Sequence, residues 1–242
     1  MLANNPAIVF DLDDTLRYND PHAHGFFCDY AETLVDRLTL EQRRTSQRWE
    51  HTYWASSIDL QTDIETFQQG SDEFWLNYSK RHLQALGLPA DTAQTHASSL
   101  HAHMRDNYEP KSRVRPETLQ ALRSLKEAGH SLGVITNRSK PIHTEMHDLG
   151  LDHYLDFYLT AAQLGAYKPR REIFDNLLKF ISRSADEIIY VGDNYYADVL
   201  GARNAGIRPI LLNWNGLYSD VDCEEIKSLA ELPNILQLAP VQ

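Results

Sequence analysis

Cysteine, glycine, proline and long apolar runs are all scarce in this chain of 242 residues. The two cysteines, Cys28 and Cys223, lie far apart and form no CxxC pair, so we expect reduced thiols rather than a disulfide framework. With 11 glycines and 10 prolines, the composition is not that of a collagen-like or disordered chain. No apolar stretch approaches the length of a membrane span, so we expect no segment within a membrane.

Basic residues are also in deficit, since 23 Lys and Arg stand against 34 Asp and Glu, a formal net charge of −11. A surface this acidic repels nucleic acids and anionic membranes, so neither is an expected partner. A small phosphorylated ligand remains compatible, because one metal ion and one lysine can reverse the sign of the local field. The first residues lack the basic start and long apolar middle of a signal peptide, which predicts a cytoplasmic location.

The chain does contain a regular alternation of short apolar segments and helical patterns. Segments rich in Ile and Val favour strands that are buried on both faces of a parallel sheet. These segments are residues 7–10 (AIVF), 132–135 (LGVI), 188–191 (IIYV) and 209–212 (PILL), with a weaker candidate at 157–159. Helical patterns occupy residues 116–128, 142–149, 173–180 and 199–205. This alternation predicts an α/β domain with a doubly wound parallel sheet.

The long interval between the first apolar segment and Pro116 interrupts the alternation. A structureless loop of this length is uncommon in a compact domain, so the interval is better explained as several helices. We therefore predict a core domain of residues 1–17 and 104–242 with a helical domain, residues 18–103, inserted after the first strand. Aromatic residues at helical spacing favour a packed interior for this insert over a platform that stacks on a ligand. The amphipathic segment 221–238 is expected to pack on the core.

Two carboxylates, Asp11 and Asp13, follow the first predicted strand. Ligands of open α/β sheets bind at the carboxyl ends of the strands, and alternate residues of an extended segment point the same way. Carboxylates so close together repel each other unless a cation neutralises them, which indicates a hard divalent ion such as Mg²⁺. Taken alone, the pair is equally compatible with a solvated acidic loop.

Three further groups of polar residues follow predicted strands or the loops beside them. Thr136 and Asn137 end the second strong strand, where a hydroxyl and a backbone N–H can hold a phosphate oxygen or simply form a turn. Lys168, just before a proline, is either an inward-pointing contact for an anion or an exposed lysine. Asp193 ends the third strong strand, and Asp198 lies in the first turn of the next helix, where a negative charge is favourable in any case.

In this order and spacing, the four groups resemble the haloacid dehalogenase (HAD) superfamily, also called haloacid dehalogenase-like hydrolases. The matching motifs are FDLDDT at 10–15, VITN at 134–137, YKP at 167–169 and VGDNYYAD at 191–198, and GARNAG at 201–206 is similar to the usual continuation. The resemblance implies a Rossmann-like core with a helical cap of the C1 type, as in phosphoglycolate phosphatase-like and nucleotidase-like members. Arg138 departs from the pattern, since glycine is frequent there, and is a candidate contact for substrate or phosphate.

The resemblance also implies catalytic roles at the matching positions. Asp11 would be the nucleophile, because a carboxylate that forms an acyl phosphate divides one displacement into two easier steps. Asp13 would protonate the leaving group and then deprotonate water. Mg²⁺ would be held by Asp11, by the backbone carbonyl of Asp13 and by Asp193.

The remaining matched residues would bind phosphate or support the site. Thr136, Asn137 and Lys168 would bind the phosphoryl oxygens, with Lys168 stabilising the developing charge. Asp198 and Thr15 would lie behind this first layer, Asp198 orienting a metal-bound water or Lys168.

The function expected from these roles is a Mg²⁺-dependent phosphatase that hydrolyses a small phosphate monoester, as a monomer or small homo-oligomer. One alternative is a phosphomutase, which returns the phosphoryl group to its substrate instead of releasing phosphate. A dehalogenase is disfavoured because a halide leaving group needs no proton, and the family's dehalogenases lack an acid at the position of Asp13. A non-catalytic binding protein would bind ligand without turnover, and the intact motifs disfavour it.

Overall fold

A computed structural model describes residues 5–236 of the chain. The described chain divides into two compact units. Residues 19–111 form one unit, which we call the helical insert, and the segments on either side of it together form the other, which we call the core.

The core is built on a six-stranded sheet in which every neighbouring pair of strands is parallel. The strands are β1 (Ala7–Phe10), β4 (Leu132–Thr136), β5 (Phe157–Thr160), β6 (Ile188–Gly192), β7 (Arg208–Leu212) and β8 (Glu224–Ile226). Their order across the sheet is β5-β4-β1-β6-β7-β8, so β1 pairs with β4 on one side and β6 on the other. The predicted doubly wound parallel sheet is confirmed, and all five predicted strands are present.

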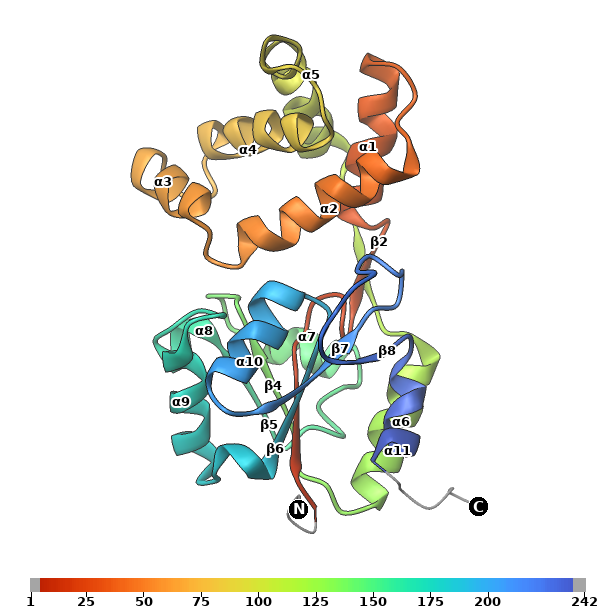
Figure 1. Ribbon diagram of the computed structural model, residues 1–242, viewed down its shortest axis with the longest axis vertical. Helices are drawn as coiled ribbons and strands as arrows, with labels where there is room; N and C mark the ends of the chain where they lie inside the picture. The colour runs from red at the N-terminus through yellow and green to blue at the C-terminus, as the bar shows by residue number, and fades with distance from the viewer. Residues whose placement is uncertain (1–4, 237–242) are drawn as a thin grey trace. The chain divides into compact units, whose positions relative to one another are not determined.

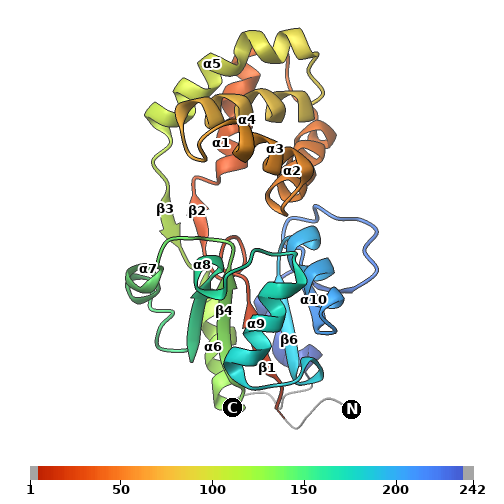
Figure 2. The same ribbon diagram turned by 90° about the vertical axis from the view of Figure 1, so that its left-hand side faces the viewer.

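Helices cover both faces of this sheet, as Figures 1 and 2 show. Ile8 and Phe10 of β1 belong to the apolar cluster of one face, whereas Val9 belongs to the cluster of the other. The first face is covered by α6 (Pro116–Glu127), α7 (His143–Asp148) and α11 (Leu232–Ile235), and the second by α8 (Ala161–Leu164), α9 (Arg171–Ile181) and α10 (Leu200–Asn204). Strands β1, β4 and β6 are buried on both faces, which explains their unbroken apolar sequences.

The predicted helix at 199–205 differs from the structure at its start. The helical backbone begins earlier, with a π-helical turn, η2 (Tyr195–Val199), that leads into α10. The side chain of Asn194 accepts hydrogen bonds from the backbone N–H groups of Tyr196 and Ala197, which caps this turn. Apolar periodicity does not reveal such a turn, because Asn194 and Asp198 place polar groups where the helix begins.

The helical insert follows β1 and contains five α-helices. They are α1 (Ala23–Leu34), α2 (Leu40–Trp54), α3 (Ile58–Thr66), α4 (Asp72–Ala85) and α5 (Ala90–Asn107). Side-chain hydroxyls of Thr39, Ser57 and Ser71 cap α2, α3 and α4. The predicted aromatic interior is present around the buried Tyr53 and Phe74. Within residues 5–236, no helix is long and apolar enough to cross a membrane.

Three short strands were not predicted from the sequence. β2 (Tyr18–Asp20) and β3 (Lys111–Arg113) form a separate two-stranded sheet at the ends of the helical insert, and β8 extends the main sheet beyond β7. Each has only three residues and a largely polar sequence, so none carries an apolar signal. The segment after β8 packs on the core through Leu229 and Leu232, as predicted, and positions 237–238 of that prediction lie outside the described residues.

Candidate active site

The residues singled out in the sequence come together at the carboxyl edge of the core sheet. Asp11 directly follows β1, Asp193 directly follows β6, and Thr136 is the last residue of β4. Because these three neighbouring strands are parallel, their carboxyl ends lie at the same edge. The backbone N–H of Asp11 donates to the carbonyl of Val191 at 2.8 Å, which fixes the start of the acidic segment to the end of β6.

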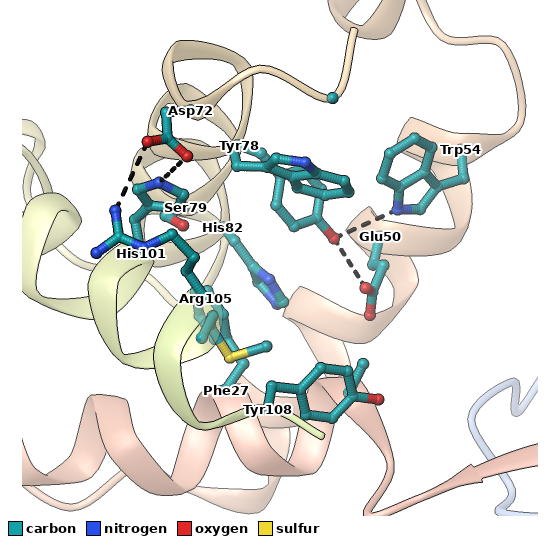
Figure 3. Close-up of a pocket in the computed structure, with 14 residues that line it drawn as sticks. Phe27, Glu50, Trp54, Asp72, Tyr78, Ser79, His82, His101, Arg105 and Tyr108 are labelled. Atoms are coloured by element: carbon teal, nitrogen blue, oxygen red, sulfur yellow. Dashed lines mark hydrogen bonds and ion pairs between the residues drawn. The ribbon is translucent and has the colours of Figure 1, made fainter. Parts of the chain in front are cut away.

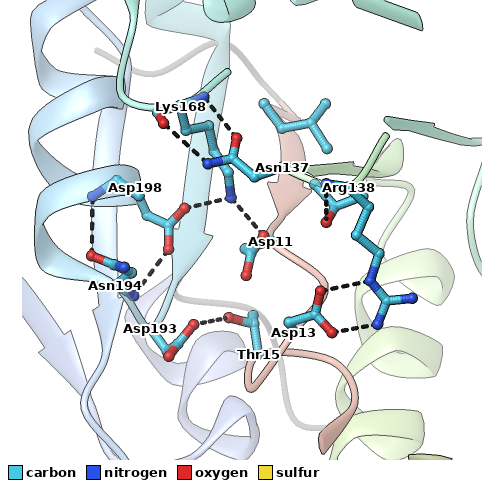
Figure 4. A network of polar contacts seen from close by, with 12 residues as sticks. Asp11, Asp13, Thr15, Asn137, Arg138, Lys168, Asp193, Asn194 and Asp198 are labelled. Atoms are coloured by element: carbon cyan, nitrogen blue, oxygen red, sulfur yellow. Dashed lines mark hydrogen bonds and ion pairs between the residues drawn. The ribbon is translucent and has the colours of Figure 1, made fainter. Parts of the chain in front are cut away.

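Lys168 joins two of the carboxylates at this edge (Figure 4). Its Nζ donates to Asp11 Oδ1 at 2.5 Å, to Asp198 Oδ1 at 2.7 Å and to the hydroxyl of Tyr190 at 3.1 Å. The lysine is only 2% exposed. Burial alone would lower its pKa, but the negative charges of Asp11 and Asp198 raise that pKa well above 10.5, so the side chain is a buried ammonium. The alternative of an exposed lysine is excluded.

Asn137 holds the main chain of Lys168 on both sides. Its Oδ1 accepts from the Lys168 N–H at 2.7 Å, and its Nδ2 donates to the Lys168 carbonyl at 3.0 Å (Figure 4). The side chain of Asn137 therefore positions the lysine, in addition to any role of its backbone N–H in binding phosphate. Thr136 is 1% exposed, and its Oγ1 accepts the Arg138 N–H at 3.4 Å.

Asp198 is fixed from the opposite side by the loop after β6. Its Oδ2 accepts the backbone N–H of Asn194 at 3.0 Å while its Oδ1 accepts from Lys168. Gly192 makes this arrangement possible, because a Cβ at that position would lie 2.3 Å from Asp198 Cγ. The same loop after β6 contains Asp193. The hydroxyl of Thr15 donates to Asp193 Oδ1 at 3.2 Å.

Asp11, Asp193 and Asp198 form a buried acidic cluster, with one carboxylate oxygen of each within 4.8 Å of the others. Burial raises the pKa of Asp11 to about 7, and the charges of Asp198 and Asp13 add to the rise, while Lys168 opposes it. The pKa of Asp193 is also raised well above 3.8, first by burial and then by the neighbouring carboxylates. A divalent cation would offset this repulsion, and a donor set made of oxygens alone suits Mg²⁺.

The Asp13 carboxylate has different partners from that of Asp11. The guanidinium of Arg138 binds both of its oxygens, with Nε 2.8 Å from Oδ2, and Arg17 Nη1 lies 3.3 Å from Oδ1. Glu145 bridges the two arginines, accepting from Arg17 Nε at 2.9 Å and from Arg138 Nη1. Arg138, a candidate contact for phosphate in the sequence, is therefore an ion-pair partner of Asp13 in this structure.

Several residues of this site were not found by sequence reasoning. Arg17 and Glu145 belong to the network around Asp13, and Tyr190 contributes a hydroxyl to Lys168. A weak signal existed for two of them. Arg17 lies four residues after Asp13, and Tyr190 is the one residue with a polar group in the apolar segment 188–191. Nothing in the sequence around Glu145 indicated a place in the site, because its partners are distant in the chain.

A parallel sheet with a helical insert after its first strand, with acidic residues at the strand ends and a buried lysine beside them, agrees with the hydrolase fold and site that the motifs predicted. A sequence profile described as haloacid dehalogenase-like hydrolase matches residues 6–206. The chain belongs to this family of hydrolases, as the motifs predicted.

Individual relatives agree with this assignment. Ribulose-1,5-bisphosphate 5-phosphatase of Halopiger xanaduensis is 31% identical over 86% of this chain and 84% of its own length. Glyceraldehyde 3-phosphate phosphatase of Methanothermobacter thermautotrophicus is 35% identical over 99 residues, which are 40% of this chain and 44% of the relative. The chain thus spans about half the length of several curated relatives that it matches.

Solved structures also share the fold. The crystal structure of a 2-haloacid dehalogenase from Pseudomonas syringae pv. Tomato DC3000 is similar, with 26% identity, a TM-score of 0.54, and coverage of 96% of this chain and 98% of that one. Dehalogenases and phosphatases therefore both occur among the proteins this chain is similar to.

Proposed function

We propose that the chain is a Mg²⁺-dependent phosphomonoester hydrolase that acts on a small phosphorylated metabolite through an aspartyl-phosphate intermediate. The observation that carries this proposal is the buried Asp11 carboxylate at the end of β1, which has the Lys168 ammonium 2.5 Å from one oxygen and Asp193 in the same cluster. A carboxylate held beside a fixed positive charge is suited to attack an anionic phosphate ester.

In the first step an oxygen of Asp11 attacks phosphorus. The new bond makes an acyl phosphate, the ester P–O bond breaks, and Asp13, which enters this step protonated and released from its ion pair with Arg138, gives its proton to the leaving alkoxide. Lys168 stabilises the negative charge on the phosphoryl oxygens, and the hydroxyl of Thr136 donates to one of them.

In the second step water attacks the same phosphorus atom. Asp13 takes the proton of the water, the bond from phosphorus to Asp11 breaks, and inorganic phosphate leaves. Both aspartates are then returned to their starting states, so the cycle needs no further reactant.

Mg²⁺ would be held by Asp11, by the backbone carbonyl of Asp13 and by Asp193. When bound, it supplies positive charge that offsets repulsion between the anionic nucleophile and the anionic substrate. Asp198 acts behind this layer by orienting Lys168, and Thr15 orients Asp193 through its hydrogen bond.

Asp13 supports phosphate transfer over dehalogenation, because only an alkoxide leaving group needs a proton. The relatives named as phosphatases act, by their names, on small sugar phosphates. We therefore infer a substrate of that size and charge for this chain.

The test is release of inorganic phosphate from a panel of phosphorylated metabolites, including glyceraldehyde 3-phosphate and ribulose 1,5-bisphosphate. Wild type and Asp11→Asn are compared with Mg²⁺ and with EDTA. We expect turnover that needs Mg²⁺ and is lost in the variant. Transfer of phosphate within the substrate, with no free phosphate, would point to a mutase instead and would contradict the proposal.

A further inference from the structure

The helical insert contains a cavity of its own, of about 620 Å³, shown in Figure 3. Residues from α1, α2, α4 and α5 line it, among them Phe27, Glu50, Trp54, Tyr78, His82 and Arg105. Much of the lining is aromatic, but Glu50 and His82 present polar atoms to the same space (Figure 3). An apolar cavity with a few convergent polar groups is typical of a binding site.

His82, on α4, is the unusual member of this lining. It is 1% exposed, and neither of its ring nitrogens has a hydrogen-bond partner among residues 5–236. The ring is held in place by stacking on Phe27, with centroids 3.9 Å apart and planes 15° apart. Burial of both nitrogens without partners is unfavourable, and a bound ion is one of the few explanations for such a group.

Two further metal-binding side chains lie beside His82, each on a different helix. His24 on α1 is 7% exposed, and Glu50 on α2 lines the cavity. One donor atom from each of the three residues lies within 4.8 Å of the other two. Donors bound to one tetrahedral Zn²⁺ at about 2.0–2.1 Å lie about 3.4 Å apart, so each pair of donor atoms needs to approach by at most about 1.4 Å.

Neighbouring groups already orient this cluster. The hydroxyl of Tyr78 donates to Glu50 Oε1 at 2.8 Å and accepts from Trp54 Nε1 at 3.3 Å (Figure 3). His24 Nε2 lies 2.9 Å from Ser46 Oγ and 3.6 Å from the sulfur of Cys28. Partners behind the ligands are a common feature of protein metal sites, because they fix ring and carboxylate orientation.

We propose that the helical insert binds a transition-metal ion, of the Zn²⁺ class, through His24, Glu50 and His82. Two imidazoles and one carboxylate form a donor set that suits Zn²⁺ and not Mg²⁺, which prefers oxygen donors alone. Burial lowers the pKa of His24 to about 3 and that of His82 well below 6.5, so both rings are neutral, the form that binds a metal. A fourth coordination position would face the cavity and accept water or a small ligand.

Co²⁺, which replaces Zn²⁺ and absorbs visible light strongly in four-coordinate sites, is the probe. The full chain is titrated with Co²⁺ in excess Mg²⁺, and equilibrium dialysis with Zn²⁺ gives the stoichiometry. We expect about one strongly absorbing Co²⁺ per chain, in wild type and equally in Asp193→Asn, whose change lies in the core. Dependence of the intense band on Asp193 would assign the ion to the core and overturn the proposal.

Variants of the insert complete the test. His82→Gln and Glu50→Gln should each weaken Co²⁺ and Zn²⁺ binding by more than about tenfold. His96→Gln, a histidine of α5 outside the cluster, should bind as wild type does. Glu50→Gln keeps the side-chain volume, so it decides the matter if His82→Gln does not fold. Absence of the band in wild type would show that the cavity holds no such ion, and unchanged affinity in Glu50→Gln would place the ion elsewhere; either result would overturn the proposal.

Discussion

Asp11 and Asp13 are two residues apart in the chain, but their carboxylates have different surroundings. Asp11 is buried and contacts Lys168, whereas the Asp13 side chain is 41% exposed and is paired with Arg138. A nucleophile needs a fixed position, and a group that exchanges protons needs access to substrate and water. The sequence predicted both carboxylates from their place after a strand. It did not predict the partnership of Asp13 with Arg138, because 125 residues separate the two.

Replacement of Asp13 tests its proposed role in proton transfer. We expect Asp13→Asn to lose on the order of 10² to 10⁴ in kcat for an alkyl phosphate, because the leaving alkoxide is no longer protonated. The loss in the phosphorylation step should be much smaller for an aryl phosphate whose leaving group needs no proton. Steady-state and burst kinetics on both esters measure this. Activity within tenfold of wild type on the alkyl ester would rule out the role.

The surroundings of Glu145 predict that the stability of the folded protein depends on pH. Although burial opposes it, hydrogen bonding from Ser112 and the charge of Arg138 lower the pKa of Glu145 from 4.5 to about 2. A depressed pKa means that the ionised group stabilises the native state above about pH 4.5, and that this contribution is lost as the pH falls towards 2. Glu145→Gln should therefore cost about 1 to 3 kcal/mol at pH 7, and progressively less below pH 4.5.

Urea unfolding of wild type and Glu145→Gln from pH 7 to pH 3 measures that difference. Glu172→Gln, an exposed residue of α9, is the matched control and should stay within about 0.5 kcal/mol of wild type throughout. A cost for Glu145→Gln that does not change with pH would mean that its charge is not the stabilising feature.

At the scale of elements, what the sequence could predict depends on burial. Strands β1, β4 and β6 are buried on both faces, so their apolar sequences identify them. β8 has the sequence EEI, with two exposed residues, and only its pairing with β7 makes it a strand. The π-helical turn η2 likewise depends on contacts of Asn194 and Asp198, which periodicity does not report.

The end of β6 offers a test of how this element positions Asp198. Gly192→Ala should destabilise the protein by about 1 to 3 kcal/mol, because the new Cβ would overlap Asp198. It should also reduce phosphatase activity, since Lys168 would lose a fixed partner. Gly25→Ala is the matched control, because a Cβ there in α1 meets no atom within 4 Å among the described residues.

Thermal unfolding and phosphate release of both glycine variants measure the two effects. Gly25→Ala should be neutral or stabilising by up to about 1 kcal/mol, because alanine favours the helix over glycine. Equal behaviour of the two variants would contradict the proposed contact between Gly192 and Asp198.

At the scale of the molecule, the acidic net charge contrasts with the local charges of the site. The chain has a formal net charge of −11, and three buried carboxylates lie together at one edge of the core sheet. An anionic substrate can approach such a site only if positive charge is concentrated there, and Lys168 supplies one part of it. A divalent cation would supply the rest. The composition made nucleic-acid partners unexpected, but only the motif order indicated this site.

Binding of Mg²⁺ should therefore stabilise the folded core. At a concentration about 100 times its dissociation constant, the ion contributes about 2.7 kcal/mol, which raises the Tm by roughly 5–10 °C for a protein of this size. EDTA should reverse the shift, and Asp193→Asn should abolish it. Differential scanning calorimetry measures all three conditions. An equal shift in Asp193→Asn would place the stabilising ion elsewhere.

The most direct test of the central claim is to trap the covalent intermediate. Wild type is mixed with Mg²⁺ and its best phosphate ester, quenched in acid during turnover, digested, and analysed by mass spectrometry. The account predicts one added phosphoryl group on the peptide that contains Asp11, absent from Asp11→Asn; with an aryl ester, whose leaving group needs no proton, it should accumulate further in Asp13→Asn. Phosphate release by wild type with no phosphorylated aspartate, or continued release by Asp11→Asn, would contradict it.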